Sequence, residues 1–174
     1  MSTRNIIALQ LDEDKYKTIY CHNEGYLKHN GAILIDHFNS REKVEELLKL
    51  GDLSLLAPHL NPEPNKPHSY EYLHRQEGVC VAYGRERGEK DTQAKILSKE
   101  QMLEYPLIQY FYIFTLDGVW KYYDSLKNEL RNVKDDLEQE YKELGFERPK
   151  NYYGGFPTET DRKQNSKKQT EEME

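Results

Sequence analysis

The chain contains little cysteine, which excludes a fold that depends on disulfides. Only two of the 174 residues are cysteines, Cys21 and Cys80, and each lies in a short apolar run typical of a strand. Small disulfide-stabilised domains carry many more, and a chain of this length can bury a sufficient core without covalent links. We therefore expect two reduced, buried thiols.

Long apolar runs are also absent. The N-terminal apolar run, Ile6–Leu11, is short and is followed at once by the acidic residues Asp12–Asp14. A membrane-spanning helix needs about 20 apolar residues, and a signal peptide needs a basic start before its apolar segment. We expect no membrane partner and a cytoplasmic location.

An excess of positive charge is missing as well. The formal net charge is −6, although 32% of the residues are charged. Proteins that bind nucleic acid usually present a basic face to the phosphates. The charge balance therefore argues against direct binding of nucleic acid and favours a protein partner, with a mimic of nucleic-acid charge as the alternative.

No motif of a known catalytic chemistry is present. Gly25 and Gly31 lack the spacing of a phosphate-binding loop, and no serine or cysteine stands in a nucleophile motif. Four side chains near these glycines could bind a metal ion but match no familiar zinc spacing: His22, Glu24, His29 and His37. We expect no cofactor and no metal ion, and these absences favour a non-catalytic protein.

What the chain does contain is one stretch, Ile19–Phe38, that begins with a strand pattern and ends with a helix pattern. Loops between regular elements often carry binding residues. The crossing between the two patterns (residues 22–30) gathers polar and aromatic side chains around Gly25, and we predict a binding site formed by His22, Asn23, Glu24, Tyr26, His29 and Asn30.

A second candidate lies in the charged segment Gly84–Asp91. Its two arginines could clamp a phosphate or a carboxylate. In the alternative interpretation, the segment is a solvated loop whose opposite charges pair with each other. The candidate binding residues are Arg85, Arg87, Glu89 and Asp91.

Strand signals recur along the chain. The dipeptide Asp117-Gly118 between two aromatic runs predicts a hairpin with a type I′ turn, and Asn5–Leu11 with Tyr16–His22 predicts another hairpin. Further strand-like runs are Ser69–Leu73, Gly78–Tyr83 and Ala94–Leu97.

Helix signals are fewer. A short helix should follow Gly31, and Asn39 with Glu42 predicts the start of a second short helix. Ser98 with Gln101 forms another capping box. Apolar residues recur every three or four positions from Leu126 to Leu144 and predict a long C-terminal helix that ends at Gly145. Its apolar side either packs on the sheet or joins two copies, so monomer and homodimer both remain open.

Together these signals predict an α+β fold. We expect an antiparallel sheet of five or six strands, with the two short helices and the long C-terminal helix packed on it. Residues 1–146 would form a single domain. Residues 147–174 would form an extended, largely disordered tail, because 158–172 contain no apolar side chain.

Four motifs occur in order: IYCHNEGY from Ile19, GDLS from Gly51, AYGRERGE from Ala82 and DGVWKYY from Asp117. On these motifs, which span most of residues 3–123, the chain resembles a family of small phage and prophage proteins. The usual pattern of that family is close to IYCHWDGY, GDLS and AYGRDRGE. This chain departs from it at Asn23, where tryptophan is usual, and at Glu24, where aspartate is usual. The resemblance implies a role in phage infection, in the host cytoplasm, and it raises interest in the charged segment.

We therefore predict a phage-encoded, non-catalytic binding protein. It would dock on a host bacterial protein, such as a defence or nucleic-acid enzyme, and inhibit or redirect it. The 14 tyrosines support this prediction, because protein interfaces are enriched in tyrosine. The alternative is a small enzyme or ligand-binding protein that binds a nucleotide or a similar anion through the crossing with Arg85 and Arg87.

Overall fold

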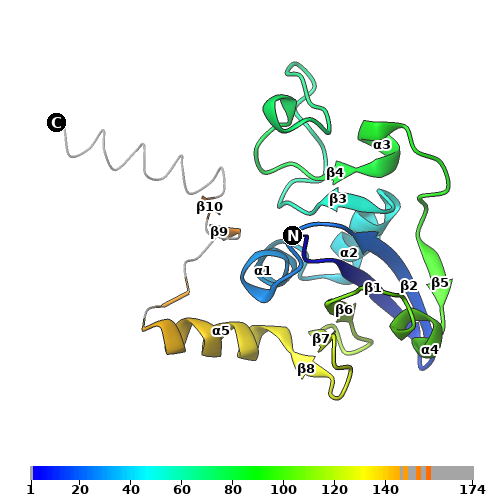
Figure 1. Ribbon diagram of the computed structural model, residues 1–174, viewed down its shortest axis with the longest axis vertical. Helices are drawn as coiled ribbons and strands as arrows, with labels where there is room; N and C mark the ends of the chain where they lie inside the picture. The colour runs from blue at the N-terminus through cyan, green and yellow to red at the C-terminus, as the bar shows by residue number, and fades with distance from the viewer. Residues whose placement is uncertain (1, 146, 149–151, 154–155, 158–174) are drawn as a thin grey trace.

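The computed structural model describes residues 2–145, 147–148, 152–153 and 156–157 and shows an α+β protein (Figure 1). At its centre is an eight-stranded sheet with the order β4-β3-β2-β1-β6-β7-β8, and β5 pairs with β2 beside β3. The strands are β1 (Asn5–Asp12), β2 (Lys15–Cys21), β3 (Leu53–Leu55), β4 (Val81–Ala82), β5 (Lys95–Leu97), β6 (Tyr110–Phe114), β7 (Trp120–Asp124) and β8 (Arg131–Asn132).

The helices surround this sheet. They are α1 (Ala32–His37), α2 (Arg41–Lys49), α3 (Tyr83–Arg87), α4 (Lys99–Leu103) and α5 (Val133–Leu144), with a π-helix at Leu27–Gly31 and a 3-10 turn at Tyr72–His74. No helix in the described part of the chain is long and apolar enough to cross a membrane.

The α+β class is confirmed, but the sheet differs from the predicted antiparallel sheet of five or six strands, because it has eight strands and is mixed. The two predicted hairpins, β1–β2 and β6–β7, are antiparallel, but β1 pairs with β6 in parallel and β2 pairs with β3 in parallel. Parallel neighbours need a long connection between them. Such pairings join distant segments, so no local sequence signal reveals them.

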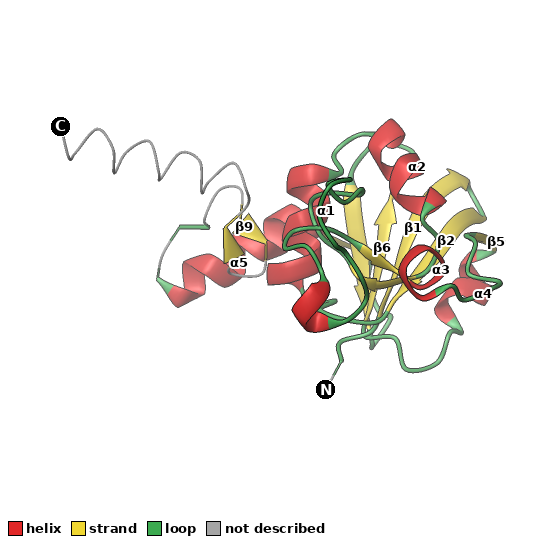
Figure 2. Ribbon diagram, turned by 90° about the horizontal axis from the view of Figure 1, so that it is seen from above, coloured by secondary structure: helices red, strands yellow, loops and turns green. Residues whose placement is uncertain are grey.

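Both faces of the sheet are buried. One face carries Ile7, Leu9 and Ile19 and packs against α1, α2 and α5. The other face carries Ile6, Phe111 and neighbours that pack against Met102 of α4. Figure 2 shows α2 lying across the strands and α4 beside β5. This double cover explains why β6, with the sequence YFYIF, is apolar at successive positions.

Several predicted element bounds need correction. Ser40, not Asn39, caps α2, since its side chain accepts a hydrogen bond from the Lys43 amide. The capping box of Ser98 and Gln101 is confirmed. Helix α5 begins only at Val133, because the chain first pairs as β8 with β7, and Leu126 is 71% exposed.

The strand predictions around the third motif are also partly wrong. Only Val81–Ala82 of the segment Gly78–Tyr83 is a strand, and Tyr83 already begins α3. Ser69–Leu73 is not a strand, whereas Leu53–Leu55, which is not among the predicted strands, pairs as β3. The long connection from β3 to β4, residues 56–80, is called the β3–β4 loop below.

Past α5, Arg148 holds Asp36 of α1 with two hydrogen bonds of 2.8 and 2.9 Å. Tyr152–Tyr153 (β9) pairs with Phe156–Pro157 (β10). Residues 158–174, on which the prediction of a disordered tail rests, lie outside the described residues.

The β6–β7 turn differs from the predicted type I′. Only Gly118 has a positive φ, 77°, and its amide donates to the Thr115 carbonyl at 2.9 Å. The Thr115 amide in turn donates to the Val119 carbonyl at 3.0 Å. This is a type I turn followed by a bulge with glycine in the left-handed position.

We predict that Gly118→Val lowers the free energy of unfolding by about 1 kcal/mol or more, because β-branched residues fit a positive φ poorly. Urea denaturation measures the change. Gly118→Asn is the control. Asparagine tolerates this region better, so the free energy of unfolding should fall less in this variant. Equal midpoints for the valine variant and the original chain would show that the turn is not strained.

Candidate binding site

The crossing leaves β2 at Cys21 and enters α1 through the π-helix Leu27–Gly31. Its first part lies against β3, since the His22 amide donates to the Leu53 carbonyl at 2.9 Å. The crossing therefore lies at the end of the central strands, between β1 and β3. Short π-helices of the kind that it contains occur often at functional sites.

The inner side of the crossing is a buried polar network centred on Asn30, which is 0% exposed. Its amide group donates to Asn5 Oδ1 at 3.2 Å and to the Asn23 carbonyl at 3.3 Å. Asn30 Oδ1 lies 2.7 Å from His29 Nδ1, which must carry the proton because an amide oxygen only accepts. Buried polar groups need such partners, so Asn30 and His29 hold the crossing in place.

Gly25 lets the crossing approach β1 closely. A Cβ atom at this position would lie 2.6 Å from the Thr3 carbonyl oxygen and 2.7 Å from Asn5 Nδ2, so a side chain does not fit. The Gly25 amide donates to the Thr3 carbonyl at 2.9 Å, and its carbonyl accepts from the Tyr112 hydroxyl at 2.5 Å. The first glycine of the crossing is thus explained by packing.

The outer side of the crossing carries half-buried side chains. The Tyr26 hydroxyl donates to Glu24 Oε2 at 2.5 Å, and burial together with this carboxylate raises the pKa of Tyr26 to about 12. His22 Nδ1 lies 2.7 Å from the Tyr20 hydroxyl. Burial, with smaller contributions from the positive charges of Arg4 and Arg87, lowers the pKa of His22.

Glu24 has an unusual backbone. Its φ is 60°, in the left-handed region that non-glycine residues seldom occupy. The Glu24 carbonyl accepts a hydrogen bond from the backbone amide of Asn30 at 3.2 Å, which helps hold this conformation. Such strain is found preferentially at binding and catalytic sites.

The predicted role of Arg85 as an anion clamp conflicts with its hydrogen bonds. Its guanidinium donates to both Glu86 oxygens, to the Leu60 carbonyl at 2.7 Å and to the Cys80 carbonyl at 3.0 Å. Glu86, whose side chain is only 3% exposed, also accepts from His68 Nε2 at 3.0 Å. Arg85 therefore fastens the β3–β4 loop to α3 and has few donors left for a ligand.

The other candidates of the charged segment lie on the surface. The Arg87 guanidinium lies 5.2 Å from the ring centres of both Tyr70 and Tyr83 and pairs with Glu89 at 3.3 Å. Asp91 is exposed, with a positive φ of 60°. Arg87 alone of these residues influences the crossing, through its charge on His22.

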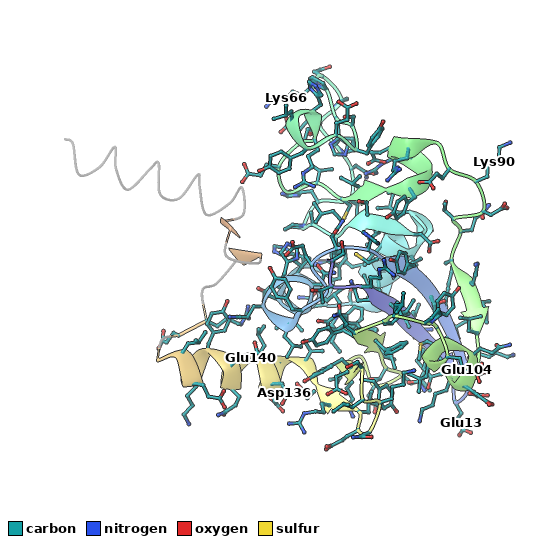
Figure 3. The ribbon with its side chains drawn as sticks, in the orientation of Figure 1. Glu13, Lys66, Lys90, Glu104, Asp136 and Glu140 are labelled. Carbon is teal, nitrogen blue, oxygen red and sulfur yellow. The ribbon has the colours of Figure 1, made fainter. Side chains whose placement is uncertain are left out.

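The β3–β4 loop forms the second wall of the site. Gln76 crosslinks it, since the side-chain amide donates to the carbonyls of Glu63 and Lys66, both at 3.0 Å, and the backbone amide donates to His68 Nδ1 at 2.9 Å. The tip of the loop, marked by Lys66 in Figure 3, lies at the opposite end of the molecule from Glu13.

A cavity of about 400 Å³ lies between the crossing and this loop. Glu24 and His29 of the crossing and Leu55 of β3 line it, and the loop contributes Ala57, Tyr72, Leu73, Arg75, Gln76, Glu77 and Gly78. None of these loop residues is among the site residues predicted from the sequence. The signal was available, because long irregular connections in compact domains are usually functional or disordered.

Neither cysteine is a usable nucleophile. Cys21 and Cys80 are free and fully buried, which confirms the predicted reduced thiols. Burial raises the pKa of Cys21 to about 11 and that of Cys80 to about 12, so both remain protonated at neutral pH. Among the described residues, no group of three or more histidine, cysteine or acidic side chains is placed to hold a metal ion.

Comparisons with known proteins add no relative: no family model, no curated protein and no solved structure matches the chain. The resemblance to small phage proteins therefore stays a prediction that rests on the four motifs.

The first prediction for the site concerns pH. Burial lowers the pKa of His29 below its usual value of about 6.5. The unfolded chain then binds more protons than the folded chain, so stability falls as the pH drops through that value. We expect His29→Asn, which keeps a donor near the Nδ1 position, to show a smaller drop in melting temperature between about pH 7.5 and about pH 5.5. The exposed His74→Asn is the control and should keep the original drop. An unchanged drop in the His29 variant would contradict the account.

The second prediction concerns the junction between the loop and α3. Glu86→Ala leaves Arg85 and His68 without their shared acceptor, and we expect the free energy of unfolding to fall by about 3 kcal/mol. Glu89→Ala removes an exposed partner of Arg87 and should change it by about 0.5 kcal/mol or less. Chemical denaturation compares the two variants, and equal effects would show that the buried network does not stabilise the loop.

Proposed function

We propose that this chain is a non-catalytic protein that binds another protein through one surface, formed by the crossing and the β3–β4 loop. The observation that carries the proposal is the exposure of Tyr72 and Leu73, which are 77% and 86% exposed at the rim of the cavity. Tyr70, 49% exposed, lies on the same loop. Large exposed side chains beside a cavity are typical of binding surfaces.

Two arginines strengthen this interpretation. Arg75 lies over the Tyr72 ring at 4.8 Å, and Arg87 lies over Tyr70 at 5.2 Å. Interfaces are enriched in tyrosine and arginine, and stacked pairs of this kind lose little side-chain freedom on binding. The surface is therefore partly preorganised for contact.

The hydroxyl and the thiols of this region are poor catalytic groups. A general acid or base works best with a pKa near the working pH, whereas burial and the Glu24 carboxylate raise the pKa of Tyr26 to about 12, and both thiols are buried. The nucleotide alternative loses support as well, because the Arg85 guanidinium already donates hydrogen bonds to carbonyl groups of the protein itself.

The resemblance to phage proteins suggests the kind of partner. We propose a host bacterial protein, such as a defence or nucleic-acid enzyme, that is inhibited or redirected when this surface docks on it in the host cytoplasm. The net charge of −6 fits a protein partner better than a nucleic acid.

The test compares proteins captured from bacterial cells by the tagged chain and by its double variant Tyr72→Ser, Leu73→Ser. If these side chains anchor the interface, we expect recovery of the partner to fall by about tenfold or more. Quantitative mass spectrometry of the captured proteins gives the measurement.

Leu116→Ser is the matched control. Leu116 is 52% exposed, and its backbone amide donates a hydrogen bond to Gln10 Oε1. Gln10 lies near the end of β1 that is remote from the crossing. This variant should leave recovery unchanged. A partner that the double variant captures as well as the original chain does would place the interface elsewhere.

A further inference from the structure

The cavity between the crossing and the β3–β4 loop combines apolar side chains with charged ones. Leu55, Ala57 and Leu73 supply aliphatic surface, and Tyr72 supplies an aromatic ring. Its volume of about 400 Å³ is at the lower end of the range for ligand sites. It is large enough for one long side chain.

Glu24 is the carboxylate on the crossing side of this cavity. Its carboxylate accepts one hydrogen bond from Tyr26 at 2.5 Å, and an ionised carboxylate has room for several more. The backbone of Glu24 has a φ of 60°. The buried network below it, through Asn30, fixes the backbone.

The charge around the cavity favours a cation. Two carboxylates, Glu24 and Glu77, and one guanidinium, Arg75, line it. Burial lowers the pKa of His29, so its ring is neutral at neutral pH and does not offset the carboxylates. Arg75 lies over the Tyr72 ring at 4.8 Å, so one face of this ring already packs against a guanidinium.

We propose that the cavity receives an arginine side chain of the partner protein, whose guanidinium binds the Glu24 carboxylate while its aliphatic part lies along Leu55 and Leu73. An arginine has an apolar stem and a fork of donors that matches a carboxylate. This inference rests on the proposed function and gives it a specific anchor.

The test is a titration followed by NMR of the amide groups, with N-acetyl-arginine methylamide as the probe. We expect saturable shifts, in the millimolar range, for residues around the cavity such as Ala57 and Gly78. The citrulline derivative has the same shape without the charge. It should bind at least about tenfold more weakly, as expected for the loss of a charge-assisted contact of about 1.4 kcal/mol.

Two variants complete the test. Glu24→Gln should weaken binding of the arginine probe at least tenfold, whereas Glu13→Gln removes the same charge at the far end of the molecule (Figure 3) and should leave it unchanged. Equal shifts with the citrulline probe, or binding that Glu24→Gln leaves intact, would overturn the proposal. The docking surface would still stand if Tyr72 and Leu73 proved necessary for capture of the partner, so the two proposals can fail separately.

Discussion

The site depends on the hydrogen bonds made by the side-chain amide of Asn30. It joins Asn5 of β1 to the carbonyl of Asn23 after β2, and it accepts from His29 one residue earlier. Without these bonds, several buried polar groups would lack partners, at a cost of about 1–3 kcal/mol for each group. The network holds the crossing close to the sheet, and the close contact of Gly25 with Thr3 becomes possible only there. Glu24, Tyr26 and His22 are consequently presented on the outer side.

A second buried network positions the facing wall. Arg85, Glu86 and His68 tie the β3–β4 loop to α3, and Gln76 crosslinks the loop internally. The loop can therefore expose Tyr72 and Leu73 while its base stays fixed. Two anchored walls with a cavity between them fit a partner with a protruding side chain, and preorganised surfaces of this kind lose less entropy on binding.

Local signals in the sequence predicted local structure well. The two hairpins, the capping box of Ser98 and the α+β class follow from patterns within about ten residues, and the structure confirms them. The parallel pairing of β1 with β6 depends on residues about 100 positions apart, and no short pattern encodes it. The sequence located the crossing but could not separate its inner from its outer side chains. Asn30 finds its partner at Asn5, and Arg85 finds Leu60, only in the folded chain.

The central claim is that a partner contacts the surface formed by the crossing and the β3–β4 loop. Site-specific photocrosslinking tests it most directly, with a photoreactive phenylalanine analogue placed at Leu73 in one variant and at Leu116 in another. The account predicts that the Leu73 variant forms a discrete crosslinked complex in bacterial cells and that the Leu116 variant does not. A complex formed from Leu116 alone, or none from Leu73 while the chain still captures its partner, would contradict it.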